Sequence, residues 1–291
     1  MIKTFPYKGA QAGPKFLVLG AVHGNEKCGT AGINRVMDEL NSGKLKIARG
    51  QVTFVPICNP RAYERDVRYT ERNLNRYLVP MEKPDCYEAE LGNILCPMLA
   101  ASDVVLDIHS YTIGGPPFIS LEDFSAEGLK LAAMLGGEAV LCGWDDAYAA
   151  AGRAETNPNE SIGTTGYARR QGATAVLIEC GQHKDPASSE VAYHAIRNAL
   201  RYLNLTDEPK QEITLNPVRL VKLKDVFFRQ DSGGKFTQHW QHLQPVKKGD
   251  VLAIDGSGRE IRAPQDSLVL LPHANVDIGG EWLYLGVETA E

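Results

Sequence analysis

Four short, nearly continuous runs of apolar residues mark the earlier part of the chain. They are rich in valine, isoleucine and leucine, and they cover residues 15–22, 51–58, 103–109 and 174–180. Runs of this kind show little alternation between apolar and polar positions, which is typical of strands covered on both faces in a parallel sheet. The pattern therefore predicts four buried, parallel strands.

Between these runs, apolar residues recur at every third or fourth position, as on one face of a helix. Residues 25–41 follow this pattern and stop near an Asn-Ser-Gly sequence, and residues 86–100 and 125–136 are similar. Residues 188–203 open with a serine that can cap a helix. Strands that alternate with helices predict an α/β fold with a mostly parallel sheet.

The pattern changes after about residue 205. From there on, short strand-like stretches are separated by Gly, Pro and Asp-Gly turns. We therefore expect two domains. Residues 1–205 would form a large α/β domain. Residues 206–291 would form a small β-rich domain, either a barrel or a sandwich.

The composition is ordinary for a soluble globular protein, since 43% of the 291 residues are hydrophobic and 23% are charged. A formal net charge of −5 argues against a chain that chiefly coats nucleic acid or anionic lipid. No apolar run reaches the roughly 18 residues of a membrane span, and the N-terminus lacks the apolar core of a secretory signal. The six cysteines are scattered, as expected of free thiols. These observations predict a cytoplasmic protein without nucleic-acid or membrane partners.

Polar side chains stand where the predicted strands end. His23 and Glu26 follow the first strand, His109 ends the third, and Glu179 ends the fourth. In an open parallel sheet the carboxyl ends of the strands meet at one edge, where ligands bind. We therefore expect two histidines and two carboxylates to lie close together at this edge.

Two histidines and one glutamate are a known ligand set for catalytic zinc, which keeps an open position for water. His23, Glu26 and His109 supply that set, and Glu179 is the candidate base that takes a proton from the activated water. Taken singly, each residue has an ordinary structural explanation, such as a turn histidine or a helix-start glutamate. Their shared position at the strand ends favours the metal site.

A run of arginines follows the second predicted strand. Arg61, Arg65, Arg68, Arg72 and Arg76 are spaced so that they could form one basic helix face, which would favour nucleic-acid binding. Acidic neighbours and turn-forming asparagines weaken that interpretation. In a metallohydrolase, one arginine can instead stabilise an oxyanion while another binds a substrate carboxylate. A solvated face remains the simplest explanation for Arg61, Arg65 and Arg72.

Four motifs in sequence order resemble those of the aspartoacylase and succinylglutamate desuccinylase family, which is related to the zinc carboxypeptidases. They are HGNE, NPRAYERDVRYTERNLNR, DIHSYT and IECG, at residues 23–26, 59–76, 107–112 and 178–181. The resemblance runs through residues 16–182 and implies a zinc-carboxypeptidase-like, mostly parallel or mixed sheet with helices on both faces. It also implies one Zn²⁺ per chain.

The resemblance implies roles for individual residues. Zinc would be held by His23, Glu26 and His109, and Glu179 would be the catalytic glutamate. The remaining roles concern the substrate: Arg68 polarises the scissile carbonyl, Asn75 and Arg76 bind a carboxylate, and Arg169 (or the adjacent Arg170), Tyr111 and Tyr284 make further contacts. The chain departs from the family at Thr165, where aspartoacylase has a substrate-binding tyrosine.

These features support a zinc-dependent hydrolase of the amide bond in a small N-acyl amino acid or a similar carboxylated substrate. A metallocarboxypeptidase acting on peptides or cell-wall fragments is the alternative. A C-terminal domain that caps the site would restrict it to small substrates. A third hypothesis is a non-catalytic module that binds an anionic partner through the arginines and holds no metal. The sequence leaves a homo-oligomer open.

Overall fold

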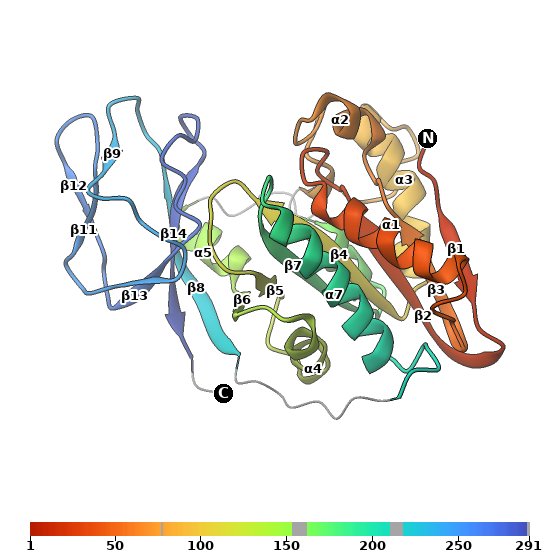
Figure 1. Ribbon diagram of the computed structural model, residues 1–291. Coiled ribbons are helices and arrows are strands. Elements are labelled where there is room, and N and C mark those ends of the chain that lie inside the picture. Colours follow the sequence, from red (N-terminus) through yellow and green to blue (C-terminus); the bar gives the residue numbers. More distant parts are fainter. Residues whose placement is uncertain (77, 153–161, 210–217, 290–291) are drawn as a thin grey trace.

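A mixed β-sheet forms the centre of the molecule in the computed structural model, which describes all residues except 77, 153–161, 210–217 and 290–291 (Figure 1). Within the described residues this sheet has eleven strands, in the order β1-β3-β2-β4-β7-β5-β6-β8-β14-β13-β10. A second sheet has the order β12-β11-β9.

The strands of the large sheet are β1 (Phe5–Lys8), β2 (Gln11–Gly20), β3 (Arg49–Val55), β4 (Val104–Tyr111), β5 (Phe118–Ser120), β6 (Ala139–Cys142), β7 (Thr174–Gln182), β8 (Arg219–Phe228), β10 (Gln244–Val246), β13 (Ser267–Leu270) and β14 (Glu281–Glu288). The strands of the small sheet are β9 (Lys235–Phe236), β11 (Val251–Ile254) and β12 (Glu260–Arg262). The helical segments are α1 (Cys28–Asn41), α2 (Pro60–Arg65), the 3₁₀ turn η1 (Leu74–Arg76), α3 (Tyr87–Ala100), α4 (Ala126–Leu135), α5 (Trp144–Ala150), α6 (Thr164–Arg170) and α7 (Pro186–Tyr202).

The four predicted parallel strands are confirmed, and they lie next to one another in the large sheet as β3, β2, β4 and β7. Strand β2 pairs in parallel with both β3 and β4, and β4 pairs in parallel with β7. The register places His109 of β4 opposite Glu179 of β7. The carboxyl ends of these strands therefore meet at one edge, as the sequence predicts.

Helices cover both faces of this sheet, and alternate residues along each strand pack on opposite sides. Phe16 and Val18 of β2 belong to the core beneath α1, α4 and α7. Leu17 and Leu19 belong to the core beneath α3 and α6. Figure 1 shows α1 and α7 running side by side on one face. The α/β class and its two helical layers are thus confirmed.

The helix boundaries differ from the predicted ones in detail. Helix α7 begins at Pro186, and Asp185 caps it by accepting a hydrogen bond from the Ala187 N–H at 2.9 Å. The predicted serine cap at Ser188 is therefore wrong, because that hydroxyl donates to the carbonyl of Gln182 instead. No helix in the described ranges combines the length and apolar character needed to cross a bilayer.

The C-terminal β-rich region continues the large sheet. Residues 139–142 of β6 pair in parallel with residues 219–222 of β8, and β14, β13 and β10 follow in antiparallel order. The small sheet of β9, β11 and β12 projects beyond them, at the left of Figure 1. The β-rich character of this region is confirmed, while its division from the catalytic part near residue 205 stays a prediction.

Candidate metal centre

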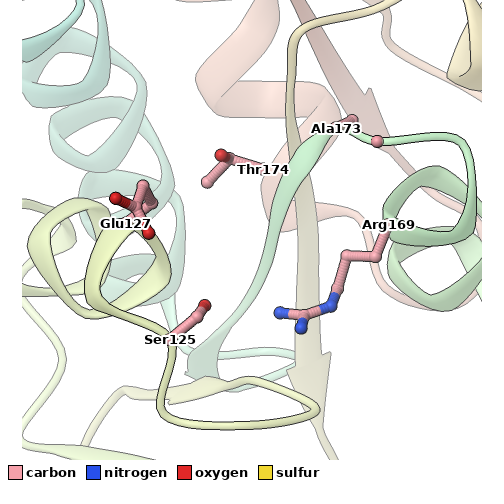
Figure 2. A pocket seen from close by; sticks show the side chains of 6 residues that line it. Ser125, Glu127, Arg169, Ala173 and Thr174 are labelled. Carbon is pink, nitrogen blue, oxygen red and sulfur yellow. The ribbon is translucent and has the colours of Figure 1, made fainter.

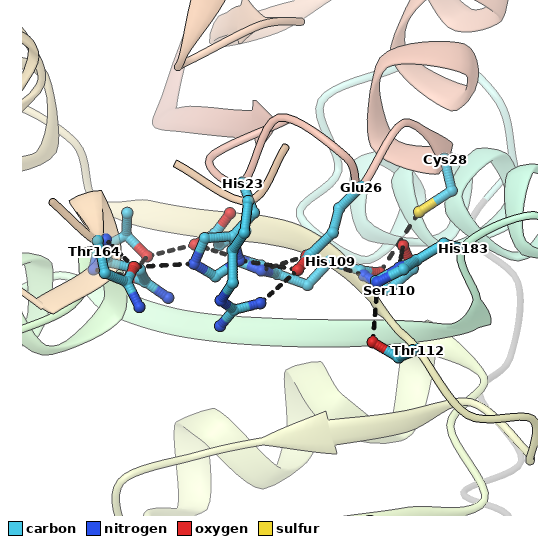
Figure 3. Close-up of polar contacts among 12 residues, drawn as sticks. His23, Glu26, Cys28, His109, Ser110, Thr112, Thr164 and His183 are labelled. Carbon is cyan, nitrogen blue, oxygen red and sulfur yellow. Dashed lines mark hydrogen bonds and ion pairs between the residues drawn. The ribbon is translucent and has the colours of Figure 1, made fainter. Parts of the chain in front are cut away.

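His23, Glu26 and His109 come together at the carboxyl edge of the sheet, and all three are buried. The Nδ1 atom of His23 lies 2.9 Å from one oxygen of the Glu26 carboxylate, and the Nδ1 atom of His109 lies 2.8 Å from the other. The ligand atoms of the three residues all lie within 4.8 Å of one another. Figure 3 shows the three side chains pointing toward a common place.

Local packing explains why the first strand can deliver two ligands so close together. The N–H of Glu26 donates to the carbonyl of His23 at 3.1 Å and closes a tight turn between them. A Cβ atom at Gly24 would lie 2.0 Å from the backbone of Ala62, so the turn packs directly against helix α2. Only glycine allows this approach.

The outer nitrogens of both histidines face side-chain oxygens, through a hydrogen bond at His23 and an ion-pair contact at His109. Nε2 of His23 lies 3.0 Å from the amide oxygen of Asn73, and Nε2 of His109 lies 2.8 Å from a carboxyl oxygen of Asp107. Histidine ligands of metals usually donate their second N–H in this way, which fixes the ring and its tautomer. In that tautomer the Nδ1 atoms, which face the Glu26 carboxylate, carry the lone pairs that a metal needs.

The charges at this site fit a cation. Burial, together with the charge of nearby Arg68, lowers the pKa of His23 to about 4, so the ring is neutral as a ligand must be. Burial also disfavours a charged His109, but Asp107 and Glu26 outweigh burial and hold its pKa well above the usual value. The carboxylates of Asp107 and Glu26 thus stabilise positive charge at the buried His109 ring. With two imidazoles and one carboxylate as donors, the residues suit zinc.

Glu179 lies beside these residues and has an unused oxygen. Its Oε2 atom is buried and has no hydrogen-bond partner within the described part of the chain. Burial, together with the charge of Glu26, raises the pKa of the Glu179 carboxyl to about 8. A buried carboxyl oxygen without a protein partner is positioned to exchange protons with a bound molecule.

Arg68 also reaches the site. Its Nη1 atom donates to Glu26 at 2.9 Å, and 46% of its side chain is exposed. The loop that carries Arg68 is fixed by the buried carboxylate of Glu88, which accepts hydrogen bonds from the N–H groups of residues 70–72 and from the Thr70 hydroxyl. The guanidinium is therefore anchored at one end and accessible at the other.

Asn75 and Arg76 lie in the 3₁₀ turn η1, near the same edge. The amide oxygen of Asn75 accepts a hydrogen bond from the backbone N–H of Thr164 at 2.8 Å, which leaves the amide NH₂ for other partners. The Arg76 side chain is exposed and donates to the carbonyl of Asn75 at 2.8 Å. The predicted pair is thus one buried amide and one exposed cation.

The structure pairs Arg169 with acidic residues away from His23, Glu26 and His109. Its guanidinium pairs with Asp123 at 2.6 Å and Glu122 at 3.3 Å. It lines a hollow of about 190 Å³ near Thr174, the first residue of β7 (Figure 2). Glu179 lies toward the other end of that strand. Five residues of extended strand separate these levels by roughly 16 Å. A substrate contact by Arg169 stays a prediction that this geometry does not favour.

The two predicted tyrosines have their hydroxyl groups engaged within the protein. Tyr111 donates to the carbonyl of Pro116 at 2.8 Å. The Tyr284 hydroxyl lies 3.0 Å from that of Tyr148, which in turn donates to Glu281 at 2.7 Å. Their proposed contacts with substrate stay predictions.

Several polar residues around the ligands carry no strong signal in the sequence. Asn73 holds His23 and is recognisable only as a neighbour of Asn75 in the second motif. His183 lies 2.9 Å from the Ser110 hydroxyl, and the Ser110 N–H donates to Glu26 at 3.2 Å. Figure 3 shows these contacts as a row that extends from Thr164 through His109 to His183.

The order and spacing of the site motifs can be compared with known proteins. Residues 12–205 match the family model described as the succinylglutamate desuccinylase/aspartoacylase catalytic domain. The chain belongs to this family. Both enzymes in the family's name are deacylases, hydrolases that split an amide bond and act on small acylated amino acids.

Relatives of known sequence and structure agree with membership of the desuccinylase/aspartoacylase family. The chain is 29% identical over 126 residues to a protein described as "Probable aspartoacylase" from Prochlorococcus marinus, and the match spans 42% of this chain and 41% of that protein's length. A succinylglutamate desuccinylase/aspartoacylase structure from Rhodobacter sphaeroides is 17% identical with a TM-score of 0.77, covering 99% of this chain and 90% of the other. The product-bound ectoine utilization protein EutE (DoeB) from Ruegeria pomeroyi is 21% identical with a TM-score of 0.74, covering 98% and 88%. These structures establish the shared fold.

Proposed function

We propose that this protein is a zinc-dependent amidohydrolase that removes the acyl group from a small N-acyl amino acid. The convergence of two imidazole Nδ1 atoms on the Glu26 carboxylate carries the proposal, together with the oxygen partners on both outer nitrogens. Membership of a deacylase family supports the reaction type.

His23, Glu26 and His109 would hold the zinc. When bound, zinc supplies Lewis acidity that polarises a carbonyl and makes water more acidic. Glu179 accepts a proton from the attacking water through Oε2, which has no hydrogen-bond partner in the described part of the chain. As the water oxygen bonds to the carbonyl carbon and the C–N bond breaks, Glu179 returns that proton to the departing nitrogen.

Two arginines have separate tasks in this mechanism. Arg68, beside Glu26 and half-exposed, donates N–H groups to the carbonyl oxygen as negative charge develops on it. Arg76 is exposed and binds the substrate carboxylate, and the NH₂ group of Asn75 contributes a hydrogen bond. The substrate is therefore held by its carboxylate while its amide reacts.

Metal analysis of the purified protein tests the proposal. We expect about one zinc per chain, loss of amide hydrolysis on chelation, and recovery when zinc is returned. His23→Ala should lose the metal, while His194→Ala, a change of an exposed histidine on α7, should keep it. A wild-type protein that holds less than a few tenths of an equivalent of zinc, and regains none, would contradict the proposal. A panel of N-acyl amino acids and peptides then separates a deacylase from a carboxypeptidase.

Arg76→Met is expected to raise KM for a carboxylated substrate by about 10- to 100-fold with little change in kcat. Hydrogen bonds to charged groups contribute about 1.5–3 kcal/mol, and loss of binding that is equal in ground and transition states appears in KM alone. Steady-state kinetics measure the effect. Arg35→Met, which removes an exposed cation paired with Glu190, is the matched control. An unchanged KM in Arg76→Met would show that the carboxylate binds elsewhere.

A further inference from the structure

Thr164 lies between the metal ligands and the substrate anchor. It is fully buried and is the first residue of helix α6. Its hydroxyl donates to the Oδ2 atom of Asp107, and its backbone N–H donates to the amide oxygen of Asn75 at 2.8 Å. The hydroxyl oxygen lies 3.3 Å from the same amide oxygen. One residue thus contacts both groups.

The hydrogen atoms at this place can be assigned. A threonine hydroxyl has one hydrogen to donate, and the shorter of its two contacts is to Asp107. The amide oxygen of Asn75 is satisfied by the Thr164 N–H. The Thr164 hydroxyl therefore donates to the Asp107 carboxyl group, and the Thr164 backbone N–H donates to the Asn75 amide oxygen.

The orientation of the Asp107 carboxyl group depends on its hydrogen bond from the Thr164 hydroxyl. It is fully buried, and its Oδ1 atom has no hydrogen-bond partner among the described residues. Its Oδ2 atom contacts Thr164 and lies 2.8 Å from Nε2 of His109. Without the hydroxyl, the His109 ring would be the remaining polar contact of this carboxyl group among the residues that the structure describes.

The second connection between anchor and ligands runs through Asn73. Its amide oxygen accepts the Asn75 N–H at 3.0 Å and lies 3.0 Å from Nε2 of His23. Together with the Thr164 contacts and the two contacts of Glu26, this closes a ring of polar contacts. Its members are His23, Asn73, Asn75, Thr164, Asp107, His109 and Glu26.

We propose that Thr164 is a positioning residue that fixes the metal ligand His109 and the substrate anchor Asn75 relative to each other. The inference rests on the proposed function. A substrate whose carboxylate is bound at Asn75 presents its amide at a distance set by its own bonds, and a misplacement of about 1 Å can cost 10²-fold in rate. A fixed spacing between anchor and metal ligand therefore favours substrates whose carboxylate and amide share that spacing.

The test compares Thr164→Val, which keeps the shape and removes the hydroxyl, with Thr164→Ser, which keeps the hydroxyl. Zinc affinity is measured without substrate, by competition with a chromophoric chelator. We expect about 10-fold weaker zinc binding in Thr164→Val. Loss of a residue that contacts a metal-binding histidine costs 10- to 100-fold in metal affinity, and Thr164 orients such a residue, Asp107. At saturating zinc, kcat/KM should also fall. Thr164→Ser should recover both zinc affinity and kcat/KM. Thr174→Val, the same type of substitution at the first residue of β7, should alter neither quantity.

Two results would overturn the inference. One is wild-type zinc affinity in a folded Thr164→Val protein, and the other is an equal loss in the valine and serine variants. If Thr164→Val does not fold, Asn75→Ala serves instead, because the ring predicts weaker zinc binding although the Asn75 side chain touches no metal ligand. Unchanged zinc affinity in Asn75→Ala would then overturn it. Failure of the proposed function looks different, because the wild-type protein would itself bind no zinc or hydrolyse no acyl amino acid.

Discussion

Glu179→Gln is expected to retain one zinc per chain and to lower kcat by about 10³-fold, within the 10²- to 10⁴-fold range for loss of a general base. The substitution preserves shape but cannot accept or return a proton. Because Oε2 of Glu179 has no hydrogen-bond partner in the described ranges, the change breaks no contact at that atom that holds the fold together. Thermal stability should therefore stay near that of the wild type.

Kinetics, zinc content and a melting curve of the same preparation measure this outcome. Glu190→Gln, a change of an exposed glutamate on α7, is the matched control and should remain fully active. The assignment of Glu179 as the base would fail if its glutamine variant hydrolysed the best substrate at close to the wild-type rate. A variant that lost zinc as well would instead assign Glu179 to metal binding.

Arg68→Met is expected to lower kcat by about 10²- to 10³-fold with little change in KM, which is the typical cost of losing one donor to a developing oxyanion. The methionine keeps most of the length of the side chain and removes the guanidinium. The hydrogen bond to Glu26 is lost as well, so zinc content must be measured in the same sample. Burial fixes Glu26 independently of Arg68, so we expect the metal to remain.

Arg65→Met is the matched control for this experiment, because Arg65 is an exposed residue three positions earlier in the chain. It should leave kcat unchanged. A large rise in KM with an unchanged kcat in Arg68→Met would assign Arg68 to substrate binding and not to the transition state. Equal effects of the two variants would point to the overall positive charge of the loop.

The central strands and the convergence of His23, Glu26 and His109 could be predicted from the sequence because they follow local rules. Near-continuous apolar runs mark strands buried on both faces, and the polar residues at their ends must meet at one edge. Strands β5 and β6 gave no comparable signal. They have three and four residues. Strand β5 is antiparallel to β7 and parallel to β6, and a pattern of alternating strands and helices does not suggest the antiparallel pairing.

The contacts around the ligands could not be predicted, because they join residues far apart in the chain. Asn73 meets His23 across 50 positions, and Thr164 meets Asp107 across 57. Arg169 illustrates the opposite case. The resemblance to the family implies a substrate contact for Arg169, but helix α6 starts beside Asp107 with Thr164, and its Arg169 pairs with Asp123. Sequence spacing does not reveal the direction in which a helix runs.

The pairing of β6 with β8 has a consequence for the chain as it is being made. Residues 139–142 leave the ribosome well before residues 219–222, which are their partners on that edge of the sheet. Domains generally begin to fold from the N-terminus during synthesis, and an unpaired strand edge invites pairing with other chains. Until β8 arrives, the nascent protein therefore exposes a short open edge at β6. In the interval between translation of these two segments, the open edge of β6 is accessible for pairing with other chains.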